Sequence, residues 1–206
     1  MQINIHEKAK NMTTTARSAI VVYTESTPNP ETLKFVSNKM LLHNDHLEFA
    51  DEASARHSDL ASELFAFPFV RGVFIADNFV TITKSEEAEW YEIIPPLRDF
   101  IREFLSENKP VIDMEWYRKL RLDSGEGEDS DDETRIKEIL DKYIKPAVQM
   151  DGGAIVFESY ENGIVKLQLK GACSGCPSSM ITLKAGIEGL LKRMMPQIKG
   201  VEAIEA

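Results

Sequence analysis

An acidic segment constrains the fold of this chain more than any other sequence feature. Residues 123–133 (DSGEGEDSDDE) hold seven acidic residues, two glycines, two serines and no apolar residue. Such a segment cannot bury surface and its like charges repel, so we expect a solvated, flexible linker. The linker predicts two domains, residues 19–122 and 134–206, and we expect residues 1–18 to form a disordered leader.

Composition excludes several classes of protein. The chain of 206 residues has a net charge of −10, of which the linker carries −7, and clustered positive charge for gripping nucleic acid or an anionic membrane is absent. No stretch approaches the ~18–20 apolar residues of a membrane span. Residues 1–18 contain one arginine, Arg17, together with Glu7, which is unlike a transit peptide. With only two cysteines, the chain is expected in a reducing, cytoplasmic compartment.

The first domain is expected to combine strands with two helices. Runs of β-branched and aromatic residues predict strands at 20–24, 33–36, 72–76 and 79–83. Apolar residues at helical spacing predict a helix at 58–67. We expect Ser85 to cap a second helix that runs to Leu105 and is interrupted or restarted at Pro95 and Pro96.

The second domain reads as helix, hairpin, helix and strand. The predicted elements are a helix over 136–144 that Pro146 kinks or ends, strands at 154–160 and 164–169, a helix over 177–194, and a strand at 201–205. Gly186 and Gly189 within the last helix suggest close packing against the sheet. The fold class is therefore α+β, with two small α+β domains joined by the acidic linker.

The chemistry of the chain is concentrated in one loop. Cys173 and Cys176, the only cysteines, lie between a predicted strand and a predicted helix. This spacing lets both sulfurs face one point, as in zinc and iron–sulfur sites. The helix that begins near Pro177 is expected to favour the thiolate form through its positive end. Neither thiol is expected in a core, so serine substitutions should leave the monomer folded.

Spacing alone leaves three interpretations of this pair open: an iron–sulfur site, a thiol–disulfide redox pair and a zinc half-site. A thiol–disulfide oxidoreductase uses the same motif at a helix start, and a zinc half-site would hold two chains together. The four histidines, His6, His43, His46 and His57, all precede the linker. We interpret His43-x-x-His46 as an exposed polar loop.

The number of ligands sharpens the metal interpretation. A zinc ion or a cubane cluster requires about four protein ligands, whereas the second domain offers two thiols and no histidine. The simplest completion is two chains that each donate two thiolates, which predicts a homodimer on metal loading. A cluster held in this way would be exposed and easily released, as suits a carrier. Without a histidine in the second domain, no Ser/His/Asp or Cys/His catalytic arrangement can be assembled there, and we expect a protein that is not an enzyme.

Longer motifs resemble a known family. Residues 150–153 (MDGG) and 171–184 (GACSGCPSSMITLK) resemble the C-terminal domain of the NifU/Nfu iron–sulfur scaffold family, and residues 27–35 (TPNPETLKF) with 72–74 and 79–84 resemble the Nfu N-terminal domain. The resemblance implies a [4Fe–4S] cluster bridged between two protomers by Cys173 and Cys176. It also implies a cluster donor and apo iron–sulfur proteins as recipients. It assigns no ligand to the first domain.

Overall fold

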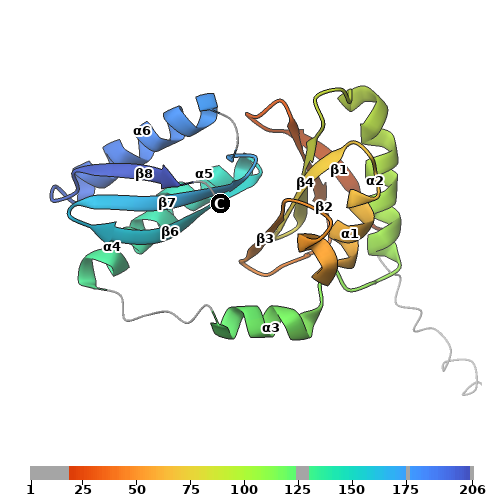
Figure 1. Ribbon diagram of the computed structural model, residues 1–206, viewed down its shortest axis with the longest axis horizontal. Coiled ribbons are helices and arrows are strands. Elements are labelled where there is room, and N and C mark those ends of the chain that lie inside the picture. The colour runs from red at the N-terminus through yellow and green to blue at the C-terminus, as the bar shows by residue number, and fades with distance from the viewer. Residues whose placement is uncertain (1–18, 124–129, 175–176, 205–206) are drawn as a thin grey trace, which may run out of the picture.

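The computed structural model of the protein describes residues 19–123, 130–174 and 177–204. The predicted leader, residues 124–129 of the predicted linker, and Cys176 lie outside these ranges. The described residues form helices and two separate sheets, which confirms the predicted α+β class (Figure 1).

The first sheet has five antiparallel strands in the order β1-β2-β5-β4-β3. Their bounds are β1 (Val22–Ser26), β2 (Thr32–Ser37), β3 (His46–Phe49), β4 (Val70–Ala76) and β5 (Phe79–Lys84). Strand β3 was not predicted, because four residues of mixed polarity give too short a period-two pattern. It pairs with β4 and forms one edge of the sheet.

Successive side chains along each strand of the first sheet point to opposite faces of the sheet. Phe35, Val80 and Ile82 belong to the core beneath α1 (Asp59–Phe65) and α2 (Trp90–Ser106). Their neighbours Val36 and Phe79 belong to a different cluster on the opposite face. This alternation follows from the period of two along a strand. The helices cover one face, and the second domain lies against the other (Figure 1).

Helix α2 differs from its prediction at its start and at its prolines. It begins at Trp90 rather than after Ser85, because the amide of Ser85 donates to the carbonyl of Phe69 and extends the β-structure. The helix then continues through Pro95 and Pro96. The carbonyls that lose their amide partners belong to the exposed Tyr91 and Glu92, where solvent can satisfy them.

The second domain begins with a helical stretch of three parts, after a helix α3 (Met114–Asp123) that was not predicted. The parts are α4 (Asp131–Ile139), a π-helical turn η3 (Leu140–Ile144) and α5 (Lys145–Met150). Ser130 and Glu133 form a capping box at the start of α4, and three acidic residues occupy its first turn. Pro146 does not end the helical stretch, because the π turn precedes it.

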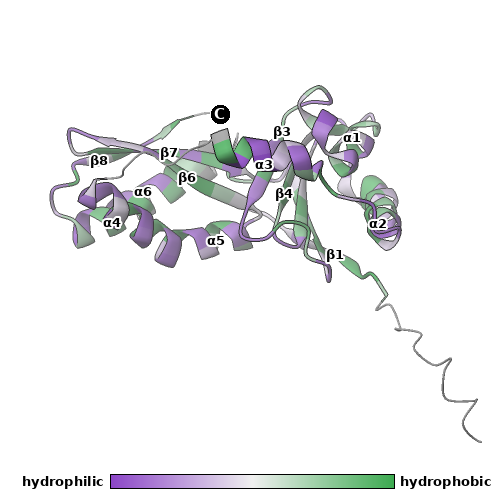
Figure 2. Ribbon diagram, turned by 90° about the horizontal axis from the view of Figure 1, so that it is seen from below, coloured by the Kyte–Doolittle hydropathy of each residue, from purple (hydrophilic) through white to green (hydrophobic). Residues whose placement is uncertain are grey.

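The second sheet contains β6 (Gly153–Glu161), β7 (Ile164–Gly171) and β8 (Gly200–Ile204), with β8 parallel to β7. Helix α6 (Pro177–Met194) makes the crossover between β7 and β8. Val165, Leu167 and Leu169 of β7 are buried with α4 and α6, as the alternation predicts. Figure 2 shows hydrophobic residues along β4 and β6 and mostly polar residues along α4. No helix in the described ranges is long and apolar enough to cross a membrane.

The expectation that Gly186 and Gly189 pack closely against the sheet is wrong. A Cβ atom built at either position would meet no atom within 4 Å. Both residues lie on the exposed side of α6, whereas Ile187 between them is buried. The two glycines therefore only loosen the helix.

Replacing both glycines by alanine should stabilise the second domain. Gly186→Ala combined with Gly189→Ala should raise the free energy of opening of the apoprotein's second domain by about 1–2 kcal/mol, because helical alanine loses less backbone entropy. Native-state amide exchange of β7 measures this. The control Gly163→Ala should lower the same free energy by about 1 kcal/mol, since Gly163 has a φ of 87° in the hairpin turn. If the double variant had the same free energy of opening as the wild type, the placement of both glycines on the exposed side of α6 would be contradicted.

Candidate functional site

The cysteine loop follows the last residue of β7. Gly171 has a φ of 64°, which turns the chain away from the sheet. The Ser174 amide donates to the Gly171 carbonyl at 3.0 Å, and the Ser174 hydroxyl donates to the same oxygen at 2.8 Å. Helix α6 begins three residues later at Pro177, a residue type suited to a first helical turn. The predicted order of strand, cysteine loop and helix is therefore correct.

Cys173 is part of the core of the second domain, which corrects the expectation that neither thiol is buried. The residue is 5% exposed, and it clusters with Ile155, Leu169 and other core residues. A Cβ atom at Gly153 would lie 2.8 Å from Cys173 Sγ and 2.5 Å from the Lys170 carbonyl oxygen. Gly153 is therefore required at the start of β6 to leave room for the thiol. Cys176 lies outside the described residues.

The expectation of a thiolate at Cys173 is also corrected. Burial raises the pKa of Cys173 to about 12, and the negative charge of Asp151 adds to this shift. In this arrangement the neutral thiol form of Cys173 is favoured, and the residue is shielded from solvent.

The histidines do not join the cysteine loop in a metal site. His46 is not in the exposed loop predicted for it, since it begins β3 and stacks on Phe74 with ring centroids 5.7 Å apart. Burial, followed by the charge of Lys170, lowers the pKa of His46. His43 is exposed, and His57 stacks on Trp116. Within the ranges that the structure describes, no three His, Cys, Asp or Glu residues are grouped to hold a metal.

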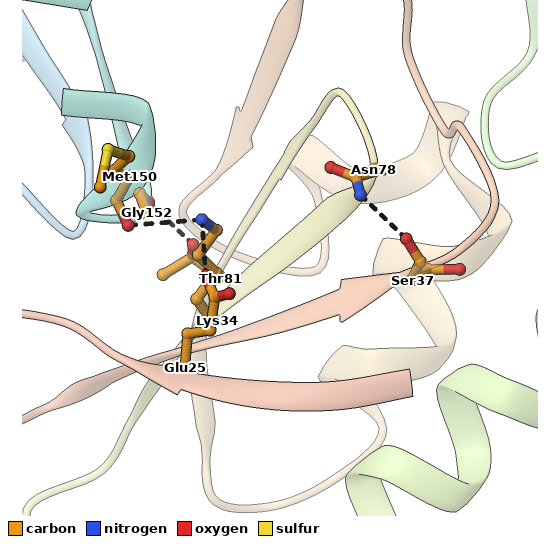
Figure 3. A network of polar contacts seen from close by, with 7 residues as sticks. All are labelled: Glu25, Lys34, Ser37, Asn78, Thr81, Met150 and Gly152. Atoms are coloured by element: carbon orange, nitrogen blue, oxygen red, sulfur yellow. Dashed lines mark hydrogen bonds and ion pairs between the residues drawn. The ribbon is translucent and has the colours of Figure 1, made fainter. Parts of the chain in front are cut away.

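The face of the first sheet that α1 and α2 leave uncovered contacts the turn that precedes β6. Lys34 Nζ donates to the Met150 carbonyl at 3.3 Å, and Thr81 Oγ1 donates to the Gly152 carbonyl at 2.7 Å (Figure 3). Lys34 also pairs with Glu25 at 3.0 Å. Gly152 has a φ of 81°, and a Cβ atom there would lie 3.0 Å from Thr81 Oγ1. The turn before β6 thus fits tightly on this sheet.

Glu48 is a residue of the site that the sequence did not reveal. Its Oε1 atom accepts a hydrogen bond from the Gly171 amide at 2.8 Å and lies 3.5 Å from Ser174 Oγ. Phe74 lies against Gly171, where a Cβ atom would be 2.9 Å from the ring. Two residues of the first domain therefore touch the loop that carries the cysteines. In the sequence, only the glycines at positions 152 and 171 could have indicated that another surface approaches the loop.

The raised pKa of Cys173 predicts slow alkylation of the native apoprotein. At pH 8, a shift from 9.0 to about 12 leaves roughly a thousandfold less thiolate than in the unfolded chain. Because the folded state keeps its proton, this residue's contribution to stability is complete below pH ~9 and falls as pH rises from ~9 towards ~12. Iodoacetamide labelling of Cys173, followed by peptide mass spectrometry, should be at least a hundredfold slower than in urea.

Asp151→Asn provides the control for this experiment. Removing the charge should lower the pKa of Cys173 and speed its labelling at fixed pH, with no change in the labelling rate of the unfolded chain. Equal rates for Cys173 in the native and urea-unfolded chains would refute the buried thiol.

Comparison with known proteins gives two family matches. The family described as "Scaffold protein Nfu/NifU N terminal" matches residues 22–108, and the family described as "NifU-like domain" matches residues 136–202. The chain is 40% identical over 187 residues to the Homo sapiens protein named NFU1 iron-sulfur cluster scaffold homolog, mitochondrial, covering 89% of this chain and 71% of that protein. It is also 40% identical to the homologue of the same name from Drosophila persimilis, covering 96% and 70%.

A solved structure adds a further likeness. The solution structure of a NifU-like protein from Saccharomyces cerevisiae is 31% identical, covers 48% of this chain and 89% of its own, and superposes with a TM-score of 0.42. The two family matches occupy the two parts of the chain whose motifs carried the resemblance. The extent of identity with the human protein is decisive. The chain belongs to the Nfu/NifU family of iron–sulfur cluster scaffold proteins.

Proposed function

We propose that this scaffold carries a [4Fe–4S] cluster as cargo between two protomers and passes it to apo iron–sulfur proteins. Cys173 and Cys176 of each protomer supply the four thiolates. A donor protein delivers the cluster or its components, and the scaffold performs no covalent turnover on a substrate. Membership of the scaffold family supports the general role. The cluster type, the dimer and the transfer step are the proposal.

The observation that carries this proposal is the supply of ligands around Cys173. A cubane cluster is held by about four cysteines. One protomer has two cysteines in all. Among the described residues, no cluster of three His, Cys, Asp or Glu side chains could complete a site within one chain. A second protomer is the simplest source of the missing thiolates.

The oxidoreductase alternative fits Cys173 less well. A redox-active cysteine at a helix start attacks as a thiolate, and such sites lower the pKa of that thiol. Here burial and Asp151 raise the pKa of Cys173 instead. A cluster scaffold has no such requirement in the apo state, because iron itself displaces the thiol proton during loading. A zinc-bridged dimer would use the same thiols and is separated by experiment.

The compartment belongs to the proposal as well. A reducing compartment keeps both thiols available for iron. The sequence favours the cytoplasm, whereas the human and Drosophila relatives are named as mitochondrial. We infer from these names that the mitochondrion is the compartment to test first, by fractionation of cells that express the tagged full chain.

Anaerobic reconstitution tests the proposed cargo. With iron and sulfide, the full chain should become brown with broad absorbance near ~400 nm and bind about four iron atoms per dimer. Light scattering after size exclusion should show monomers converting to dimers in proportion to iron. Subsequent addition of an apo [4Fe–4S] enzyme should restore that enzyme's activity while the scaffold loses colour.

Variants of the loop complete the test. Cys176→Ser and Cys173→Ala should each abolish the cluster, and alanine is chosen at Cys173 because its pocket is apolar. Ser174→Ala, between the two cysteines, is the matched control and should keep the iron. A loaded protein that stays monomeric without an added thiol, or a cysteine variant that still turns brown, would refute the proposal. A colourless, zinc-loaded dimer would establish the structural alternative instead.

A further inference from the structure

Four side chains of the first sheet form one row across four strands. Strand register pairs Lys34 with Thr81, Thr81 with Phe74, and Phe74 with Glu48. We call these four residues the docking row. The row lies on the face that α1 and α2 leave uncovered (Figure 1).

The docking row meets the second domain at both glycine turns that border the cysteine loop. Lys34 and Thr81 donate to carbonyls of the turn before β6, at Met150 and Gly152. At the other end, Phe74 and Glu48 contact Gly171. The two turns are themselves linked, since the Ala172 amide donates to the Gly152 carbonyl at 3.2 Å. All four residues of the docking row therefore contact either the start of the cysteine loop or the turn before β6.

An apolar patch beside the row extends the contact. Val36, Phe74, Ala76 and Phe79 of the first sheet cluster with Ala154 of β6, and all five are at least nine-tenths buried. Gln149 Nε2 donates to Asp77 Oδ2 at 3.0 Å at the margin of this patch. Without the second domain, these apolar side chains would face water, which favours docking.

We propose that this sheet face is a docking surface for the apo cysteine loop, and that it competes with a second protomer for that loop. The inference rests on the proposed function, because only a bridged cluster requires a second copy. In the docked form Cys173 Sγ lies in its own core beside Gly153, and Glu48 holds the loop at Gly171. Release of the row removes the hydrogen bond by which Glu48 holds the loop at Gly171.

Electrostatics makes docking and loading antagonistic. A cluster held by four thiolates carries net negative charge. Glu48 lies 3.5 Å from Ser174 Oγ, and Ser174 is between the two cysteines in the chain. Loading therefore places like charges together and weakens the Glu48 contact. By linkage, the factor by which docking lowers cluster affinity equals the factor by which the cluster lowers the docking equilibrium.

Ala154→Glu is the variant that opens the docked form. Its carboxylate would be buried among Phe74, Phe79 and Val36 in the docked chain but would face water in the open chain. Ser159→Glu adds the same charge to the same strand, opposite Lys166 and outside the patch, and is the matched control. Glu48→Ala is a second opening variant, which removes the charged acceptor of the Gly171 amide.

Three measurements on the apo full chain test the docking surface. We expect Ala154→Glu and Glu48→Ala to increase the radius of gyration in X-ray scattering, the amide exchange of peptides covering 171–174, and maleimide labelling of the loop thiols. Labelling and exchange should each rise about tenfold, the effect of losing a charge-assisted hydrogen bond. Ser159→Glu should match the wild type. Cluster loading of both opening variants should be several-fold faster than that of the wild type.

The outcomes separate the two proposals. A wild-type apoprotein with an unprotected Gly171 amide would overturn the docking surface, as would an opened variant that labels and loads at wild-type rates. If no chain takes up a cluster while the opening variants still label and exchange faster, the docked loop is supported and the proposed cargo is refuted. Should Ala154→Glu fail to fold, Glu48→Ala answers the same question.

Discussion

The period of two along the strands of the first sheet decides how the whole chain is arranged. Alternate residues of β2, β4 and β5 belong to the core beneath α1 and α2, namely Phe35, Val73, Ile75, Val80 and Ile82. The residues between them could have been uniformly polar, as on many sheets with one wet face. Instead they include Val36, Phe74 and Phe79, which need cover. The second domain supplies that cover, and it does so with the end that carries the cysteine loop.

That end of the second domain is shaped by glycines rather than by large side chains. Gly152 and Gly171 adopt positive φ, and Gly153 leaves space for Cys173 Sγ. A Cβ atom at any of these positions would meet a neighbour at 3.0 Å or less. The backbone can therefore come close to the first sheet and to the thiol at once. The same three glycines therefore set the contact with the first sheet, the position of the Cys173 thiol and the turn of the chain.

Local patterns predicted much of this fold. The strands of the second domain, the hairpin turn between β6 and β7, and the cysteine loop before α6 follow from alternation and turn chemistry. Contacts between distant residues decided the rest. Ser85 does not cap a helix, because its amide donates a hydrogen bond to the carbonyl of Phe69. Strand β3 forms because it pairs with the edge of β4. The burial of Cys173 depends on β6 passing beside it, which the spacing of two cysteines does not encode.

The short stretch between Asp123 and Ser130 gives the docked arrangement a concentration advantage. Tethered over so few residues, the first sheet meets its own cysteine loop at an effective concentration on the order of millimolar. In the dimer proposed above, a second protomer competes with this local concentration, so the metal–sulfur bonds have to supply the strength of association between protomers.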